Sequence, residues 1–252
     1  MLSRFEPAAS TDSLRDTVPP TNRPAASPLP RSLFHPLVVS SVTAASLLAS
    51  YGVWHRFLRR IRSTDDLRRG DFSPRRLHGV VVGVRDPDNL RLWHRPLLRR
   101  FQKPPVTRAG ITAQTLHVRL AGIDAPELAH WGNPEQPYAR EALDLLSRTA
   151  LNQPVSVELY QKDRYNRVVG HAYLRRSFPF FRRRCLSEIM LEEGLATVYE
   201  QEGAVVSGAA LERFRALEAK ARKAKKGMWA QGAKYESPAE YKRRTRAGAQ
   251  KG

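Results

Sequence analysis

Carboxylates and arginines gather in three short stretches of the sequence, and each stretch stands beside segments that alternate as strands do. The stretches are 85–89 (RDPDN), 119–127 (RLAGIDAPE) and 163–167 (DRYNR). Taken singly, each is ordinary turn or loop chemistry, because Asp and Asn side chains bond their own backbone in turns. Taken together, they predict acids and arginines at the mouths of neighbouring strands. That combination suits hydrolysis of a phosphodiester.

The chemistry of phosphodiester hydrolysis explains why these residue types matter. Attack on the phosphorus gathers negative charge on the phosphate oxygens, and an arginine, which is always charged, can hold two of these oxygens at once. Calcium takes carboxylate and carbonyl oxygens as ligands, and it can polarise a phosphate and help to ionise a water. A carboxylate that is not bound to the metal can orient that water or accept its proton. Two arginines, one or two metal-binding aspartates and one further glutamate therefore form a minimal apparatus.

The elements that must position these residues can be read from the alternation of apolar side chains. Period-two alternation predicts strands at 77–84, 89–94, 115–120, 154–160 and 168–174. Helical spacing predicts helices at 137–151, 187–193 and 209–226, whereas residues 95–113 fit neither pattern and predict a long loop. Five strands, with a helix after the third and helices at the end, predict an α+β fold. We expect a small five-stranded OB-type β-barrel with about three flanking helices.

The amino-acid composition narrows the classes of binding partner that can be expected. The formal net charge is +19 over 252 residues, and such an excess attracts polyanions, of which nucleic acid and anionic membrane surfaces are the natural candidates. A merely soluble basic protein is the alternative. The sequence contains one cysteine, Cys185, which excludes an intrachain disulfide and a cysteine-rich zinc site. No base partner for Cys185 is evident, so we expect no catalytic role for it.

The N-terminal part predicts a membrane anchor. Residues 1–32 are rich in Pro, Ser, Thr and Ala and predict a disordered arm. Residues 37–54 carry no charge and, as a helix, would span roughly 27 Å, close to the thickness of a hydrocarbon core. A buried helix and a cleaved signal peptide are the alternatives. The predicted segments are a disordered arm, a transmembrane helix, a basic linker, a folded domain and a disordered basic tail, at 1–32, 33–54, 55–75, 76–230 and 231–252.

The polar stretches resemble the staphylococcal nuclease-like, or thermonuclease, family from about residue 76 to residue 229. The central motif of that family is an arginine, an aspartate five residues later, and Pro-Glu two and three residues beyond it, which is the spacing of Arg119, Asp124 and 126–127. Shorter matches follow at 86–88 (DPD), 163–167 (DRYNR), 194–196 (GLA) and 227–229 (GMW). With its N-terminal span, the chain is similar to a fungal branch of membrane-anchored endonucleases assigned to mitochondria.

The resemblance implies a calcium-dependent endonuclease that acts on DNA, RNA or both. Arg119 and Arg167 would clamp the scissile phosphate and stabilise its developing charge. Glu127 would position or deprotonate the attacking water. The resemblance alone suggests a mitochondrial location. Nucleic acid and the membrane are the implied partners, and no obligate protein partner is evident.

The resemblance also implies the metal ligands. Asp124 and Asp88 would hold calcium, and Ala125 would add its backbone carbonyl. Two departures from the family pattern bear on this site: Pro87 stands where a turn glycine is usual and could shift Asp88, and Ala125 replaces a common threonine.

Two other functions are alternatives to the prediction of an endonuclease. The same barrel can bind nucleic acid without cutting it, as an inactive module tethered to a membrane. The arginines after the span could instead bind anionic lipid, although that leaves the spaced acids unexplained. His117 and His130 are weak candidates for metal ligands, and Tyr165 and Tyr199 could stack on a base or sugar or simply pack.

Overall fold

The computed structural model of the chain describes residues 36–99, 101–129, 133–174, 183–200, 206 and 208–249. The chain divides into two compact units, residues 1–49 and 50–252. The predicted N-terminal arm, residues 1–32, lies outside the described residues. Every strand belongs to the second unit, which also holds the three polar stretches.

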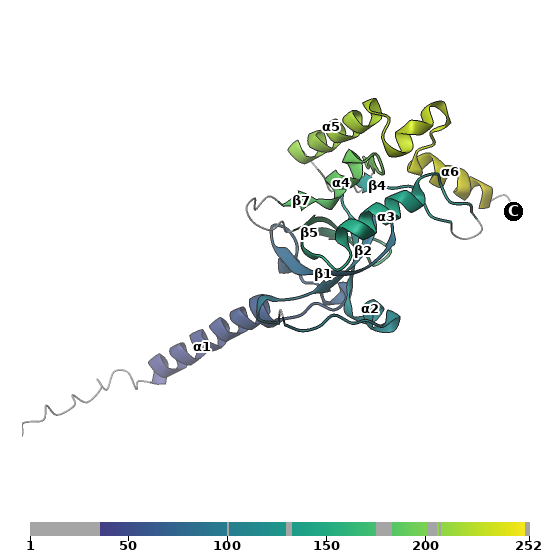
Figure 1. The fold of residues 1–252 in the computed structure, drawn as a ribbon. Coiled ribbons are helices and arrows are strands. Elements are labelled where there is room, and N and C mark those ends of the chain that lie inside the picture. The colour runs from purple at the N-terminus through teal and green to yellow at the C-terminus, as the bar shows by residue number, and fades with distance from the viewer. Residues whose placement is uncertain are drawn as a thin grey trace, which may run out of the picture. The chain divides into compact units, whose positions relative to one another are not determined.

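The second unit is built on one main sheet (Figure 1). Its strands lie in the order β3-β2-β1-β5-β6-β7. Their bounds are β1 Arg76–Asp86, β2 Asn89–His94, β3 Leu116–Leu120, β5 Pro154–Lys162, β6 Val168–Leu174 and β7 Arg184–Cys185. A parallel pairing of β3 with β6 brings the two sides of the sheet together in an incompletely closed barrel. The prediction of an α+β fold of OB type is confirmed, and all five predicted strands are present.

Alternation of side chains explains why these segments form the sheet. Leu77 and Val81 of β1, Leu92 of β2, Val118 of β3 and Val157 of β5 are all buried in one core. Burial of each such side chain contributes about 1.5–3 kcal/mol relative to exposure. Because apolar side chains fill the interior, polar groups that act on a ligand must lie at the ends of the strands.

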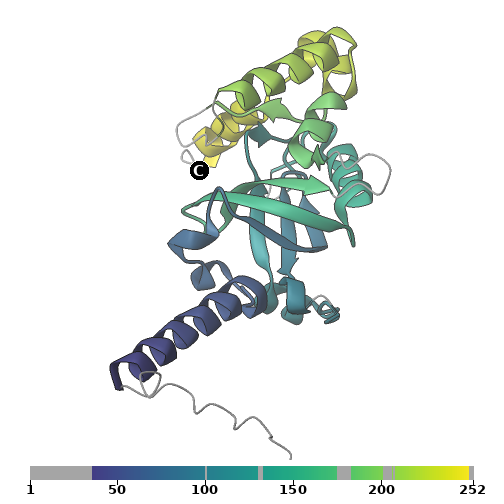
Figure 2. The same cartoon turned by 90° about the vertical axis from the view of Figure 1, so that its left-hand side faces the viewer.

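Three helices flank the sheet where the sequence predicts them: α3 Ala139–Ala150, α4 Leu186–Glu192 and α5 Ala209–Lys223. The first packs against β1, and the second contacts both β6 and α5. Two short strands, β4 Ile123–Asp124 and β8 Thr197–Val198, form a separate pair beside them. Figures 1 and 2 show α5 and α6 beyond one end of the sheet and α2 at the other end.

The predicted loop at 95–113 is wrong in part, because helix α2, Arg108–Gln114, lies within it. The side chain of Thr107 caps this helix by accepting a hydrogen bond from the backbone N–H of Gly110 at 3.1 Å. Such a cap satisfies one of the donors that the first turn leaves without a helical partner. A single turn of 3₁₀-helix, η5 Leu97–Arg99, also falls in this segment.

A second unpredicted helix, α6 Pro238–Ala249, lies in the segment expected to be a disordered tail, residues 231–252. Ser237 and Glu240 form a capping box at its start: Ser237 Oγ accepts from the backbone N of Glu240 at 3.2 Å, and Glu240 Oε2 accepts from the backbone N of Ser237 at 2.9 Å. The box and a proline in the first turn favour a helix here. Tyr241 anchors α6 because its ring is buried.

The N-terminal helix α1, Pro36–Val53, continues through the π-helical turn η2, Trp54–Leu58. The combined helix is long and apolar enough to cross a membrane, and its most apolar window is not buried in the structure. The hydroxyls of Ser40, Ser41 and Thr43 donate to carbonyls four residues earlier. These bonds satisfy the hydroxyl donors within the helix, as a membrane-spanning helix would require.

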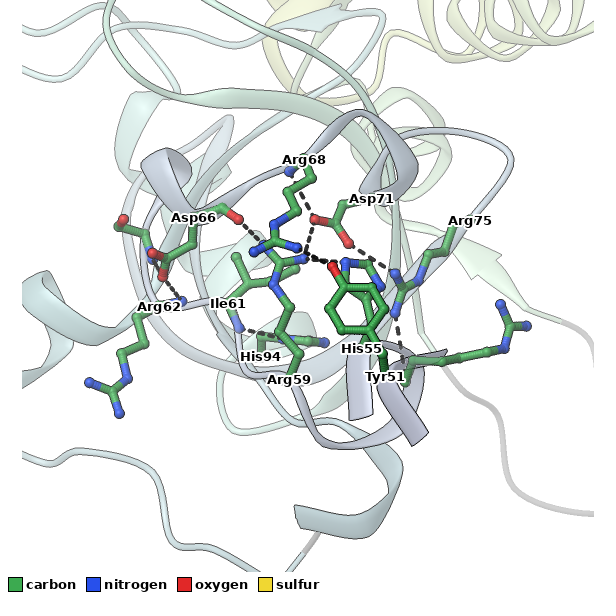
Figure 3. A network of polar contacts seen from close by, with 12 residues as sticks. Tyr51, His55, Arg59, Ile61, Arg62, Asp66, Arg68, Asp71, Arg75 and His94 are labelled. Atoms are coloured by element: carbon green, nitrogen blue, oxygen red, sulfur yellow. Dashed lines mark hydrogen bonds and ion pairs between the residues drawn. The ribbon is translucent and has the colours of Figure 1, made fainter. Parts of the chain in front are cut away.

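The segment expected to be a basic linker, residues 55–75, packs against the sheet (Figure 3). The buried carboxylate of Asp71 lies between Arg59, at 2.7 Å, and Arg75, at 2.9 Å. Ile61 joins the core, and its backbone N donates to His94 Nδ1 at 3.0 Å. Loss of one partner from such a buried ion pair leaves an uncompensated charge. These contacts therefore fix the chain between Arg59 and the first strand.

Candidate active site

The three polar stretches meet in one cleft of about 1180 Å³ in the second unit. Strand register explains this: Asn89, at the start of β2, lies opposite Arg119 of β3, and β3 pairs in turn with the start of β6, directly after Arg167. The cleft is lined by every residue that the sequence analysis assigned to the site, namely Asp88, Arg119, Asp124, Ala125, Glu127 and Arg167.

Arg119 is held between two aspartates. Its Nε lies 3.3 Å from Asp88 Oδ2, and its Nη2 lies 3.2 Å from Asp124 Oδ1. The guanidinium also stacks over the ring of Tyr199, with its carbon 4.9 Å from the ring centroid. Burial lowers the pKa of Arg119, but the two carboxylates outweigh it and raise the pKa above its ordinary value. The side chain is 18% exposed, so this fixed cation can still be reached from the cleft.

Arg167 is oriented by a different set of partners. Its Nε donates to Asp163 Oδ2 at 2.7 Å, and its Nη1 donates to Asn89 Oδ1 at 3.4 Å. Asp163 Oδ1 also accepts from the backbone N of Tyr165 and of Arg167. Burial raises the pKa of Asp163, but the bonds from Arg167 outweigh it and hold the pKa below its ordinary value. Asp163 therefore stabilises the turn and orients the side chain of Arg167.

Asp88 lies in the cleft although Pro87 replaces the usual glycine. Its backbone carbonyl accepts from the backbone N of Leu120 at 2.8 Å, which ties the turn to β3. Asp88 Oδ1 accepts from Asn89 Nδ2 at 2.6 Å, while Oδ2 faces Arg119. The turn is thus held from two sides, and the proline does not carry the carboxylate away from the site.

The loop after β3 positions the other two acids. Gly122, at φ +74, turns the chain into β4, where Asp124 pairs with Thr197 of β8. The backbone of Glu127 is fixed by Gln136 in both directions, because Gln136 Oε1 accepts from Glu127 N and Gln136 N donates to Glu127 O, each at 2.9 Å. Gln136, which the sequence analysis did not single out, therefore supports the glutamate.

Helix α6 brings Lys242 into the cleft, a residue that the sequence analysis also missed. Lys242 Nζ lies 2.6 Å from Asp124 Oδ1 and 2.8 Å from Glu127 Oε1. Burial lowers the pKa of Lys242, but the two carboxylates outweigh it and raise the pKa above its ordinary value. Burial raises the pKa of Asp124, and the ammonium of Lys242 opposes that shift. A cation thus stands between the expected metal ligand and the expected base.

The carboxylates of the cleft are the type of ligand that a hard cation such as calcium prefers. Among the described residues, no group of three or more His, Cys, Asp and Glu side chains gathers closely enough to hold a metal by itself. The acids do meet in pairs on a positive charge, Asp124 with Glu127 on Lys242 and Asp88 with Asp124 on Arg119. Carboxylate oxygens suit calcium or magnesium better than softer metals. A metal here needs ligands beyond the carboxylates.

The candidates Tyr165 and Tyr199 line the cleft, whereas Cys185 and His117 do not. Cys185 is buried, which raises the pKa of its thiol to about 11 and disfavours the reactive thiolate. Burial, followed by the charges of Arg91 and Arg167, lowers the pKa of His117 to about 4. His130 lies outside the described residues.

The fold is of OB type, and comparisons with known proteins identify the family to which it belongs. Residues 117–231 match the family described as staphylococcal nuclease homologue. A "Probable endonuclease LCL3" of Schizophyllum commune is 41% identical over 208 residues, which cover 79% of this chain and 71% of the relative. A protein of the same name from Pyrenophora tritici-repentis is 38% identical over 244 residues, which cover 89% of each chain. The chain belongs to the staphylococcal nuclease homologues.

The resemblance predicted from the motifs is therefore confirmed. The family match begins after Asp88, so it includes Arg119, Asp124, Glu127 and Arg167 but not that aspartate. A third relative, "Probable endonuclease lcl3" of Aspergillus oryzae, is 39% identical over 231 residues, which cover 85% of this chain and 82% of the relative.

Proposed function

We propose that this chain is a calcium-dependent endonuclease that hydrolyses phosphodiester bonds of DNA, RNA or both. The observation that carries the proposal is that one cleft brings together the five side chains expected to act, from separate stretches of sequence: Arg119, Arg167, Asp88, Asp124 and Glu127. The names of the relatives, which describe probable endonucleases, support it. The net charge of +19 supports a polyanionic substrate.

The two arginines would bind the scissile phosphate. Arg119 is oriented by Asp88 and Asp124, and Arg167 by Asp163 and Asn89, before any substrate arrives. Preorganised cations stabilise developing charge without a reorganisation cost during the reaction. Because Arg119 lies in β3 and Arg167 lies in the turn before β6, they can contact the phosphate from two directions.

Asp124 and Asp88 would hold calcium, with the backbone carbonyl of Ala125 as a further ligand. When bound, calcium supplies polarisation of the phosphate and a lower pKa for the attacking water. Lys242 would have to leave Asp124 first, because two cations a few ångströms apart repel strongly in a partly buried site. Lys242 is therefore a built-in competitor for the metal.

Glu127 would orient the attacking water or accept its proton. Its backbone is fixed by Gln136, and its carboxylate is 29% exposed on the cleft. A positioned general base typically contributes a factor of 10² to 10⁴ in rate. The release of Lys242 would also free this carboxylate for the water.

The helix from Pro36 to Leu58 would tether the activity to a membrane. The mitochondrial location that the resemblance implies is part of the proposal. A second candidate function is a nucleic-acid-binding module that does not cut. It is favoured by the ion pairs of Lys242 with Asp124 and Glu127, which occupy both acids.

A cleavage assay separates the two candidates. Full-length protein in detergent would be incubated with DNA and with RNA, in calcium and in a calcium chelator. We expect cutting in calcium only. Arg119→Ala should reduce the rate by about 10²- to 10³-fold, as loss of a preorganised donor does elsewhere.

The matched control is Arg140→Ala, since Arg140 pairs with Glu135 on the surface at 2.9 Å. It should cut at the wild-type rate. Equal cutting with the chelator would exclude the calcium requirement. Binding of nucleic acid without cutting in either condition would favour the non-cutting module.

A further inference from the structure

The end of the sheet that lies away from the cleft carries a surface that the proposed reaction does not use. Strand β2 starts at Asn89, in the cleft, and ends at His94, just before η5. Six strand residues extend about 17 to 20 Å. The segment that follows β2 is therefore separated from the site by the length of the strand. Helix α2, which ends this segment, lies at the opposite end of the sheet from α6 in both views (Figures 1 and 2).

This segment exposes an unusual amount of apolar surface. Four large apolar side chains within ten residues are more than half exposed: Leu97 at 59%, Leu98 at 59%, Phe101 at 84% and Val106 at 90%. Outside this segment and the helix that ends at Leu58, two other large apolar side chains are exposed in the described part of the chain, Leu151 and Tyr165. A local concentration of this kind is typical of a surface that contacts another apolar phase.

Arginines border the same surface. Arg60, Arg62, Arg68 and Arg99 line one cleft of about 550 Å³ together with Trp54 and Leu58, at the end of the candidate span. Burial lowers the pKa of Arg60, and the nearby charges of Arg62 and Arg99 add to that effect. The turn η2, which ends the helix, contacts η5 directly. The basic cleft is therefore continuous with both the helix end and the apolar segment.

The acids on this cleft are already engaged. Asp65 pairs with Lys162 at 2.8 Å, and Asp66 Oδ2 accepts from the backbone N of Arg62 at 2.7 Å and of Ser63 at 3.2 Å. Arg60 is held inward, with its guanidinium over Trp93 and its Nη2 donating to Gln114. The protein thus keeps several like charges close together, an arrangement that favours an external anion.

We propose that this surface, defined by Leu97, Leu98, Phe101, Val106, Arg62 and Arg99 and called the docking face, binds the anionic headgroups of the membrane that holds the helix. The phosphates of the lipids pair with the arginines, and the apolar side chains reach the boundary between headgroups and acyl chains. Bilayer contact suits the face because it continues from the end of an apolar span and combines positive charge with apolar side chains.

The docking face orients the domain. Because the cleft lies at the other end of β2, docking turns the cleft toward the aqueous phase, where a nucleic acid can reach it. The inference rests on the proposed membrane span and does not depend on catalysis. It predicts that the domain rests on the bilayer and does not swing freely from its anchor.

A fluorescent probe on the full-length protein tests the docking face. Phe101→Cys would be labelled with an environment-sensitive dye, since the native Cys185 is buried. Tyr165→Cys, which is 60% exposed on the cleft, is the matched control position. The vesicles would contain phosphatidylcholine, with or without phosphatidylserine, and a lipid-borne quencher.

We expect a blue shift and quenching at position 101 in the anionic vesicles, and neither at position 165. The double variant Arg62→Glu, Arg99→Glu should lose both signals while its thermal unfolding stays near that of the parent. A dye at 101 that stays as water-exposed as the dye at 165 would overturn the proposal. So would a shift that the charge reversal leaves intact, or one that vanishes when the protein is diluted in lipid, which would indicate contact between two copies.

Flotation and cleavage assays on the same preparation show which hypothesis has failed: the membrane span, the docking face or the nuclease activity. Protein that does not float with the vesicles would refute the span and, with it, the docking face. Protein that floats with a water-exposed dye at 101 would refute the docking face alone. A cleavage assay on the floated protein reports on the nuclease activity independently of both.

Discussion

Replacement of Lys242 by methionine should tighten calcium binding. The substitution keeps most of the side-chain stem and removes the ammonium that lies 2.6 Å from Asp124 and 2.8 Å from Glu127. If the cleft binds calcium as proposed, calcium would have to displace this internal cation in the wild-type protein before it reaches the carboxylates. In the variant, the carboxylates lose their internal partner and the net charge of the cleft falls by one.

The magnitude follows from the burial of the three groups. Asp124 is 4% exposed, and Lys242 and Glu127 are each 29% exposed. At the effective dielectric constant near a protein surface, two unit charges at 4 Å interact by about 4 kcal/mol before desolvation is counted. Desolvation of the ammonium offsets a large part of this attraction. A net effect of about 1–3 kcal/mol corresponds to calcium affinity that is about 5- to 150-fold higher.

Titration calorimetry of full-length protein in detergent measures this affinity directly. Lys226→Met is the matched control, because Lys226 pairs with Glu193 on the surface at 3.4 Å. The control should bind calcium as the wild type does. Without calcium, Lys242→Met should unfold at a lower temperature because its acids repel, and calcium should raise that temperature more than it does in the wild type. Unchanged or weaker calcium binding by Lys242→Met would refute the idea of a competing cation.

Three further predictions follow from buried groups in the second unit. Burial lowers the pKa of His94 from 6.5 to about 3, so between these values the unfolded state binds a proton that the folded state does not. The free energy of unfolding should therefore fall by about 1.4 kcal/mol per pH unit on acidification over this range. The variant His94→Asn keeps an acceptor for Ile61 N but cannot bind this proton. Denaturant titrations at several pH values should show that the variant lacks this contribution to the pH dependence of its unfolding free energy. Gly122→Ala should destabilise the fold by more than about 1 kcal/mol, because φ is +74 and a Cβ would meet Phe214; an unchanged unfolding temperature would contradict this. Cys185 should resist alkylation at neutral pH until the protein is denatured, as mass spectrometry can show, because it is buried and its thiol pKa is raised to about 11.

The strands and the main helices could be predicted from the sequence because their signals are local. The predicted strands at 89–94 and 168–174 have the same bounds as β2 and β6. Burial of alternate side chains fixes both the existence and the facing of such strands. The motif spacing likewise indicated the arginines and acids of the cleft, and strand register then explains how the separate stretches meet.

The contacts that the sequence could not reveal join distant segments. Lys242 and Asp124 are 118 residues apart, and nothing local to either one predicts their ion pair. The helix that carries Lys242 was within reach of prediction, because Ser237 and Glu240 form a capping box. Its basic residues, with Gly and Ala, predict disorder by composition instead.

The segment at 55–75 is a second case in which contacts between distant residues could not be predicted from local sequence. Its arginines predict a solvated linker by composition alone. The structure buries Asp71 between Arg59 and Arg75, and it places Ile61 in the core. A polar sequence can be ordered when its charges pair internally, and only the three-dimensional arrangement shows which charges do so.

The most direct test of the proposed mechanism measures binding and cutting separately in Glu127→Gln. The amide keeps the size of the side chain and cannot accept the proton of the attacking water. With calcium and excess enzyme, we expect nucleic-acid binding within about twofold of the wild type and single-turnover cleavage that is slower by about 10²-fold or more. Cleavage at the wild-type rate would contradict the assignment of Glu127 and, with it, the proposed mechanism.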